Sequence, residues 1–257
     1  MIIRKSAQEI AKMAAAGRIV SETITHVGEQ LEPGVATGEL DRIAADYIRS
    51  RGGTPTSQGY RGFPGAICIS PNAMVVHGIP GPYEVAEGDL ITIDVGVTLD
   101  GYIADSAYTF AVGEVSEQAQ RLLDTGRGAL AAGIAQAVPG NRVGDISAAV
   151  QHLVEGAGFS VVRSLVGHGV GRSYHEDPHI PNFGQPGRGP LLAEGMTIAI
   201  EPMITAGQSD VRVGEDGWTI TTADGSLSAH FEHTVAITPD GPRILTPRVG
   251  LARSVEV

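Results

Sequence analysis

The sequence predicts an α+β fold in which helices lie outside an inner antiparallel sheet. The order helix, helix, strands occurs twice along the 257 residues. Two similar segments, AEGDLITID (86–94) and AEGMTIAIE (193–201), occupy matching places in that order, and each runs an apolar strand into a carboxylate. We therefore expect one domain over residues 1–257, built from two diverged copies of about 1–114 and 115–257, with a cleft at their seam.

The first half begins with two helical patterns. Ser6 and Glu9 form the Ser-x-x-Glu capping pattern at the start of a long helix that stops before Pro33. Thr37 is expected to cap a second helix, which the glycines at 52–53 end. The strands expected after these helices are 66–70, 90–97 and 102–112.

The second half repeats the order. Ser116 is expected to cap a helix that ends before Pro139, and a second helix follows over about 145–155. Strands are expected at 159–166 and 196–204, followed by several hairpins. Asp-Gly pairs, which favour tight turns between strands, occur at 100–101, 216–217, 224–225 and 240–241.

Composition excludes several classes of partner. The net charge is −11, only two of the 18 basic residues are lysines, and no basic run occurs, so neither specific nucleic acid nor an anionic membrane is expected to bind. Cys68 is the single cysteine, which rules out an intrachain disulfide and indicates a reducing compartment. No apolar run approaches the roughly 20 residues of a membrane span, and the N-terminus does not read as a signal peptide, so we expect a cytoplasmic location.

Asp94 is the first candidate for chemistry. It follows the apolar run LITI, and the Asp-Gly turn at 100–101 can fold the next strand back upon it. With a two-residue turn, positions whose numbers add up to 201 face each other, so Asp94 lies opposite Ala107 and diagonal to Asp105. The diagonal brings the two Cβ atoms to roughly 7–8 Å. Carboxylates that close in an apolar strand pair repel each other unless a proton or a cation compensates them.

Two further acids stand in apolar strand segments. Glu201 is the counterpart of Asp94 in the second segment, and Glu232 lies in SAHFEHTVAI. Any one of these acids alone is most simply a strand-end residue in solvent. Four acids in a repeated pattern favour a cation site.

Histidines flanked by glycine add imidazole donors. His168 in VGHGVG and His77 in VVHGIP each follow an apolar strand, and glycine lets backbone and ligand approach closely. Other histidines are expected to be structural or exposed, namely His26, His152, His179, His230 and His233.

The expected metal ligands are four carboxylates and one imidazole, namely Asp94, Asp105, His168, Glu201 and Glu232. Four carboxylates neutralise two divalent metal ions, and oxygen-rich ligation with one imidazole suits Mn, Co or Fe(II) better than a thiolate zinc site does. Two ions about 3.5–4 Å apart would share and activate a water and polarise a carbonyl. The chemistry indicated is hydrolysis, with spare histidines for the substrate carbonyl and the leaving group.

Six motifs in chain order resemble those of type I methionine aminopeptidases, which are M24-type metallopeptidases. They are HGIP at 77, IDVG around 94, GYIADSA around 105, GHGVGRSYHEDP around 168, AIEPM around 201 and SAHFEHTVAIT around 232. The resemblance covers essentially the whole chain. It implies the pita-bread fold, a single catalytic domain, and removal of the initiator methionine when the second residue is small, by attack of a metal-bound water or hydroxide on the scissile carbonyl.

The resemblance also implies roles for individual residues. Glu201 is implied as the acid/base for the attacking water, His175 as the group that stabilises the oxyanion or positions the carbonyl, and His77 as a contact to the scissile amide nitrogen. Together with these two histidines, the implied methionine-binding residues are Tyr60, Phe63, Cys68, Tyr174 and Trp218.

The resemblance also bears on the residue at position 57 and on a second cation site. Ser57 stands where some relatives have cysteine, a departure expected to change inhibitor or metal sensitivity rather than the reaction. The family also has a monovalent-cation site built largely from carbonyls, which is implied here near Asn72 and Ser228.

The resemblance also implies binding partners, and two alternative functions remain open. The resemblance implies nascent polypeptide N-termini as partners, at the ribosome or after release, and a monomer; the lack of an extension before the first helix is typical of the short bacterial form. One rival is a proline-specific aminopeptidase or dipeptidase, which usually carries a large extra N-terminal domain. The other is a non-catalytic binding protein on the same scaffold, which typically loses metal ligands.

Overall fold

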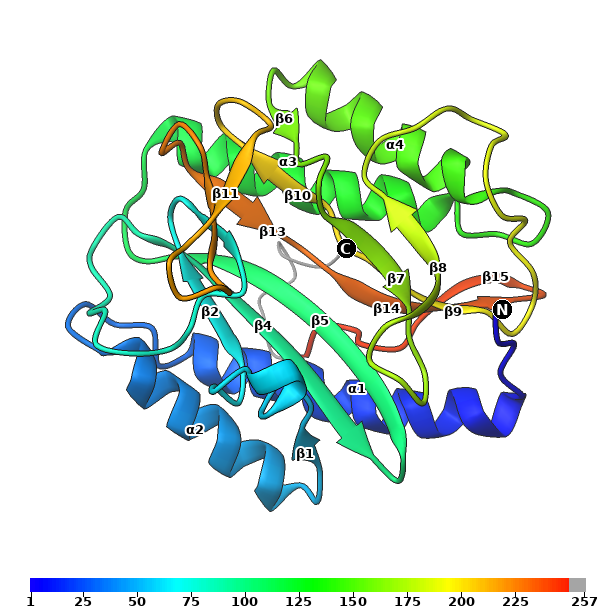
Figure 1. The fold of residues 1–257 in the computed structure, drawn as a ribbon, viewed down its shortest axis with the longest axis horizontal. Helices are drawn as coiled ribbons and strands as arrows, with labels where there is room; N and C mark the ends of the chain where they lie inside the picture. The colour runs from blue at the N-terminus through cyan, green and yellow to red at the C-terminus, as the bar shows by residue number, and fades with distance from the viewer. Residues whose placement is uncertain (250–257) are drawn as a thin grey trace.

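The structure, a computed structural model, describes residues 1–249. Helices α1 and α2 cover one side of the strands, at the bottom of Figure 1, and α3 and α4 cover the other. This arrangement confirms the α+β prediction. The helices are Ala7–Gly28 (α1), Thr37–Ser50 (α2), Glu117–Ala135 (α3) and Val143–Gly156 (α4), with a short 3₁₀ helix at Tyr60–Gly62 (η1).

Two of the expected helix starts are confirmed. Ser6 caps α1, and its capping box with Glu9 is complete in both directions. Ser116 caps α3 by accepting a hydrogen bond from the N–H of Ala119. These side chains satisfy amide groups that would otherwise lack a partner at the first turn.

The expected cap of α2 is wrong. Ala36 holds the N-cap position and makes no side-chain bond, while Thr37 is the first helical residue. The hydroxyl of Thr37 instead donates to the carbonyl of Gly81 and accepts from its N–H. A tertiary contact with the loop at 81 has replaced the local capping bond.

Within residues 1–249, the strands fall into four antiparallel sheets. The strands of the first half are Thr54–Pro55 (β1), Cys68–Pro71 (β2), Met74–Val76 (β3), Leu90–Leu99 (β4) and Tyr102–Ala111 (β5). The strands of the second half are Ser160–Val161 (β6), Val166–Gly169 (β7), Glu176–Pro181 (β8), Thr197–Ile200 (β9), Met203–Thr205 (β10), Val211–Val213 (β11), Ile220–Thr222 (β12), Ser228–His230 (β13), His233–Thr238 (β14) and Gly241–Ile244 (β15).

Each half contributes one main sheet. In the first, β4 pairs with β1, β2 and β5; in the second, the order is β15-β14-β9-β7-β8. Two small sheets have the orders β13-β10-β6 and β11-β12-β3, and the latter joins a strand of the first half to two of the second. One cluster of buried apolar side chains also draws on both halves, for example Ile24 and Ile93 with Leu130 and Ile198.

The hairpin β4–β5 has the register that the sequence predicts. Asp100 and Gly101 both have positive φ, 50° and 77°, which suits a two-residue turn. Asp94 pairs with Ala107, and Gly96 pairs with Asp105. The two acids therefore lie on one face of the hairpin, in diagonal positions.

The two Ala-Glu-Gly segments share one backbone conformation. Gly88 and Gly195 have φ values of 88° and 86°, a region that glycine enters without the penalty of a Cβ. The N–H of Gly88 donates to the carbonyl of Val112 at 2.8 Å, and that of Gly195 donates to Ile237 at 3.0 Å. The same bond at the same place in each half supports the predicted duplication.

Two threonines join the halves by reciprocal hydrogen bonds. The hydroxyl of Thr109 on β5 accepts from the N–H of His230 and donates to its carbonyl, both at 2.9 Å. The hydroxyl of Thr234 on β14 accepts from the N–H of Asp105 at 2.9 Å and donates to its carbonyl at 2.8 Å. Each half thus fixes the main chain of one residue in the other half.

Two of the long strands expected in the second half are interrupted. The segment 159–166 forms β6 and the start of β7, with irregular chain between them. The segment 196–204 breaks at Glu201 and Pro202 between β9 and β10. Proline has no N–H for a ladder and restricts the residue before it. The break removes Glu201 from the regular sheet, whereas Asp94 stays in the middle of β4.

Candidate metal and substrate site

A cavity of about 300 Å³ lies where the two halves meet. The five expected ligands all line it, namely Asp94, Asp105, His168, Glu201 and Glu232. The seven other residues implied for substrate or catalysis line it as well, namely Tyr60, Phe63, Cys68, His77, Tyr174, His175 and Trp218. The structure therefore brings together in one cavity all the residues expected to bind the divalent metals or the substrate.

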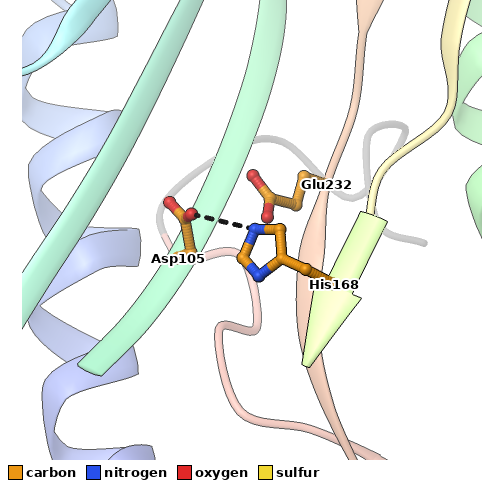
Figure 2. Close-up of side chains that lie close together, drawn as sticks. All are labelled: Asp105, His168 and Glu232. Atoms are coloured by element: carbon orange, nitrogen blue, oxygen red, sulfur yellow. Dashed lines mark ion pairs between the residues drawn. The ribbon is translucent and has the colours of Figure 1, made fainter. Parts of the chain in front are cut away.

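The candidate ligands come from different strands of both halves. Asp105 lies on β5, His168 on β7, and Glu232 between β13 and β14. One ligand atom from each of the three lies within 4.8 Å of the others, and Figure 2 shows the His168 ring pointing between the two carboxylates. The His168 Nε2 atom is 3.9 Å from Asp105 Oδ2 and 3.5 Å from Glu201 Oε1.

The acids form a buried negative cluster. Burial, followed by the charges of the neighbouring acids, raises the pKa of Asp105 and Glu232 well above the usual range. Burial likewise raises the pKa of Glu201, and it raises that of Asp94 to about 7. Asp94 Oδ1 and Glu232 Oε1 have no hydrogen-bond partner within residues 1–249.

Within residues 1–249, the charge of one arginine lowers the pKa of an acid in this cluster. Arg248 donates to the carbonyl of Ala107 at 2.6 Å and lowers the pKa of Glu232, but burial dominates. One guanidinium cannot balance four buried carboxylates, and buried charges require a partner. The donor set of oxygens with one imidazole therefore fits divalent cations.

His168 is oriented to present one nitrogen to the acids. Its Nδ1 lies 2.9 Å from the carbonyl of Gly169 and donates to it in the tautomer that leaves a lone pair on Nε2. Burial lowers the pKa of His168 to about 4, so the ring is neutral, as a metal ligand must be. A Cβ at Gly167 would overlap the carbonyl of Ala199, and one at Gly169 would overlap that of Asp177. The glycines beside His168 are thus required by close backbone packing.

Four aromatic side chains form a wall of the cavity beside the candidate ligand acids. The rings of Phe63 and Trp218 meet edge to face with centroids 5.2 Å apart, and Tyr60 and Tyr174 meet in the same way at 5.2 Å. Cys68 is buried and pairs across the sheet with Asp94, so it connects this wall to the acids. A thioether or another slender apolar group suits such a surface.

Ser57 has a definite place in this wall. Its hydroxyl lies 3.1 Å from the Tyr174 hydroxyl, which in turn donates to Asp105 Oδ1 at 3.4 Å. Ser57 is therefore linked to a candidate ligand through one tyrosine. A cysteine there would replace a strong hydrogen-bonding group by a weak one.

The two candidate catalytic histidines approach from opposite halves. His77 follows β3 with φ of 57° and faces Trp218, with ring centroids 6.3 Å apart. His175 precedes β8; its ring centroid is 4.1 Å from that of His168, and its Nδ1 is 3.0 Å from the Tyr60 hydroxyl. Burial lowers the pKa of both rings, that of His175 to about 3. Both are neutral, which lets each donate or accept a hydrogen bond.

A buried ion pair fixes the loop that carries His175. Lys5 Nζ lies 2.6 Å from Glu176 Oε2, and both side chains are almost inaccessible to solvent. The other oxygen of Glu176 accepts from the N–H groups of Arg172 and Ser173. Lys5, which precedes the N-cap of α1, therefore anchors the chain next to a candidate catalytic group.

The sequence reading missed one histidine. His230, expected to be structural or exposed, lines the cavity, and its Nε2 lies 3.7 Å from Glu201 Oε2. Its spacing of two from Glu232 is the signal that could have found it, because alternate residues of a strand share a face. His233 was also expected to be structural or exposed. It is buried, and its Nδ1 lies 3.0 Å from the Thr246 hydroxyl, which fits a structural role.

Comparisons with known sequences agree on one family. The sequence model of metallopeptidase family M24 matches residues 11–239. The chain is 52% identical over 246 residues to a methionine aminopeptidase of Clostridium perfringens, covering 96% of this chain and 99% of that protein. It is 48% identical over 246 residues to methionine aminopeptidase 1 of Bacillus subtilis, again covering 96% and 99%.

Solved structures agree with the sequences. The methionine aminopeptidase of Thermotoga maritima superposes with a TM-score of 0.94 at 44% identity, covering 96% of this chain and 99% of that chain. The prolidase of Pyrococcus furiosus superposes with a TM-score of 0.78 at 22% identity, covering 96% of this chain but 66% of that one. The second likeness concerns the fold alone.

Proposed function

Because the chain belongs to metallopeptidase family M24, we propose that it is a methionyl aminopeptidase that removes N-terminal methionine from proteins and peptides whose second residue is small. One observation carries this proposal: four buried carboxylates and a neutral imidazole share one cavity with an apolar wall of aromatic and sulfur side chains. The family relationship and the expected pita-bread fold are confirmed by the matches to methionine aminopeptidases over nearly the whole chain.

We propose that two divalent metal ions, Mn, Co or Fe(II), bind at this site. The residues that would hold them are Asp94, Asp105, His168, Glu201 and Glu232. When bound, such ions lower the pKa of a coordinated water and polarise a carbonyl. The excess of buried negative charge, together with the acid oxygens that lack partners within residues 1–249, supports this assignment.

Three protein side chains would act on the water and on the scissile peptide bond. Glu201, with one oxygen 3.5 Å from His168, would take a proton from the attacking water and return it to the leaving amine. His175 would donate to the oxygen of the scissile carbonyl as negative charge develops there. His77 would contact the scissile amide nitrogen from the other side of the cavity.

The apolar wall would hold the methionine side chain. Phe63 and Cys68 are buried, while Tyr60 and Trp218 are partly exposed and leave access from solvent. Burial of a slender thioether against aromatic rings is favourable.

A monovalent cation is proposed near Asn72 and Ser228. The Ser228 hydroxyl lies 2.8 Å from the carbonyl oxygen of Asn72 and 3.0 Å from that of Met74. Three oxygens therefore converge at this point, next to the small sheet that joins the halves. Oxygen donors of this type suit a hard cation.

Neither rival function has a supporting observation. The prolidase-like alternative shares the fold at 22% identity, and the chain covers 66% of that protein. The non-catalytic alternative conflicts with the presence of all five candidate ligands and both candidate catalytic histidines in one cavity.

We further propose one catalytic domain that acts as a monomer in the cytoplasm on nascent polypeptide N-termini, at the ribosome or after release. The core cluster shared by both halves supports the single domain. In the part of the chain that the structure describes, no helix has the length and apolar character needed to cross a bilayer.

A peptide assay tests the proposed function. The purified chain, freed of metal by a chelator, is incubated with Met-Ala-Ser after addition of Mn, Co, Fe(II), Ni or Zn, and release of free methionine is measured. We expect release with Mn, Co or Fe(II), none with chelator, and little from a peptide with a bulky second residue. Full activity in Asp105→Ala or Glu232→Ala would contradict the ligand assignment.

A further inference from the structure

The imidazole of His230 is buried in the cavity. It is 2% exposed, and neither ring nitrogen has a hydrogen-bond partner within residues 1–249. A buried polar group left unpaired costs about 1–3 kcal/mol. An unpaired imidazole in a polar cavity therefore calls for an explanation.

The ring of His230 faces one oxygen of Glu201. Its Nε2 lies 3.7 Å from Oε2, while the Nε2 of His168 lies 3.5 Å from Oε1. The two oxygens of this carboxylate are thus divided between two imidazoles. His168 is oriented by its bond to Gly169, and its Nε2 also lies 3.9 Å from Asp105 Oδ2, so the Oε1 side of Glu201 faces a second candidate ligand as well.

The main chain of His230 is held rigidly. Thr109 bonds both its N–H and its carbonyl, in the same way that Thr234 bonds both groups of Asp105. His230 lies four residues before Thr234, and Asp105 lies four residues before Thr109. His230 is therefore the counterpart, in the second half, of a candidate ligand in the first.

We propose that His230 is a positioning residue that donates a hydrogen bond from Nε2–H to Glu201 Oε2 and so keeps Oε1 directed toward His168. This proposal rests on the proposed aminopeptidase function. A neutral imidazole carries one N–H, and a small rotation of either side chain shortens 3.7 Å to hydrogen-bond distance. With Oε2 held, Glu201 no longer rotates about its last bond, and the oxygen that handles the proton stays in place.

Three variants test the direction of this bond. We expect His230→Leu to lower kcat on Met-Ala-Ser about 10–100-fold, with KM and bound metal unchanged. His230→Gln places an amide N–H near the position of Nε2 and should recover most of kcat, whereas His230→Asn ends near Nδ1 and should not. His152→Gln, on the exposed face of α4, is the matched control and should behave as wild type.

A second measurement does not depend on activity. In metal-free protein labelled with ¹⁵N-histidine, we expect the His230 ring to carry its proton on Nε2 and that proton's signal to shift in Glu201→Gln. Thermal unfolding checks that each variant is folded; if His230→Leu is not, the contrast between the Gln and Asn variants decides.

Four results would overturn the proposal: unchanged kcat in His230→Leu, equal losses in the Gln and Asn variants, loss of bound metal, or a proton on Nδ1. Loss of metal would make His230 a ligand instead. Failure of the wild-type chain to release methionine would be a different result, because it would contradict the proposed function itself.

Discussion

Asp94 and Glu201 end two similar segments, yet their surroundings differ. Asp94 lies in the middle of β4, where ladder partners on both sides hold it, Cys68 on β2 and Ala107 on β5. Glu201 lies outside the ladder, before Pro202, and both of its oxygens face imidazoles. A repeated strand thus places an acid at equivalent positions in both halves, while the neighbouring side chains decide what each acid does.

The largest effect should separate these two acids. In Glu201→Gln we expect kcat on Met-Ala-Ser to fall about 10³-fold even in excess metal, because general acid–base catalysis contributes about 10²–10⁴. In Asp94→Asn we expect weaker binding of one metal ion and recovery of much of the activity as metal is added. Calorimetric metal titration beside steady-state kinetics measures both. Equal recovery in the two variants would show that Glu201 is only a ligand.

The next effect compares the two histidines that the halves contribute. His175→Ala should lower kcat about 10²–10³-fold, as loss of an oxyanion donor does, with metal content near normal. His77→Ala should lower kcat less, because it contacts the amide nitrogen rather than the developing charge. His152→Ala, at an exposed position on α4, provides the control. Loss of metal from His175→Ala would instead move His175 into the ligand set.

A smaller effect is expected on how the free energy of unfolding depends on pH. Burial raises the pKa of Asp94 to about 7 and raises that of Glu201, so the folded metal-free chain binds protons that the unfolded chain has already released. The contribution of these acids to the free energy of unfolding should therefore fall as pH rises from 5 to 7, while buried histidines with lowered pKa values, such as His168 and His175, contribute in the opposite direction. Manganese should remove the loss that the acids cause. Urea unfolding with and without chelator measures it, and Asp94→Asn should reduce the loss. The same change in stability between pH 5 and pH 7 in wild type and Asp94→Asn would contradict the prediction.

The smallest effect tests the reciprocal bonds between the halves. Thr109→Val and Thr234→Val each leave a buried N–H and carbonyl unpaired, so each should lower the free energy of unfolding by about 1–3 kcal/mol. Thr234→Val should also weaken metal binding, because Thr234 holds Asp105, while Thr109→Val should lower kcat through His230. Urea unfolding and metal titration distinguish them. Equal metal affinities in the two variants would show that the bonds serve stability alone.

Much of the site could be predicted because it depends on patterns of residues that lie close together in the sequence. The Asp-Gly turn at 100–101 set the register that places Asp94 and Asp105 on one face, and the glycines around His168 indicated close backbone packing. The remaining roles came from the resemblance to methionine aminopeptidases. His230 was missed, because a single histidine in an apolar strand does not show what it faces.

The sequence by itself determined the helix starts at Ser6 and Ser116, the β4–β5 register and the acids that the strands carry, because these depend on neighbours a few residues apart. Tertiary structure alone decided that Thr37 bonds Gly81 instead of capping α2, that the chain breaks at Glu201, and that His230 faces this carboxylate. Each of these depends on groups that are distant along the chain. Only folding brings such groups within hydrogen-bond range.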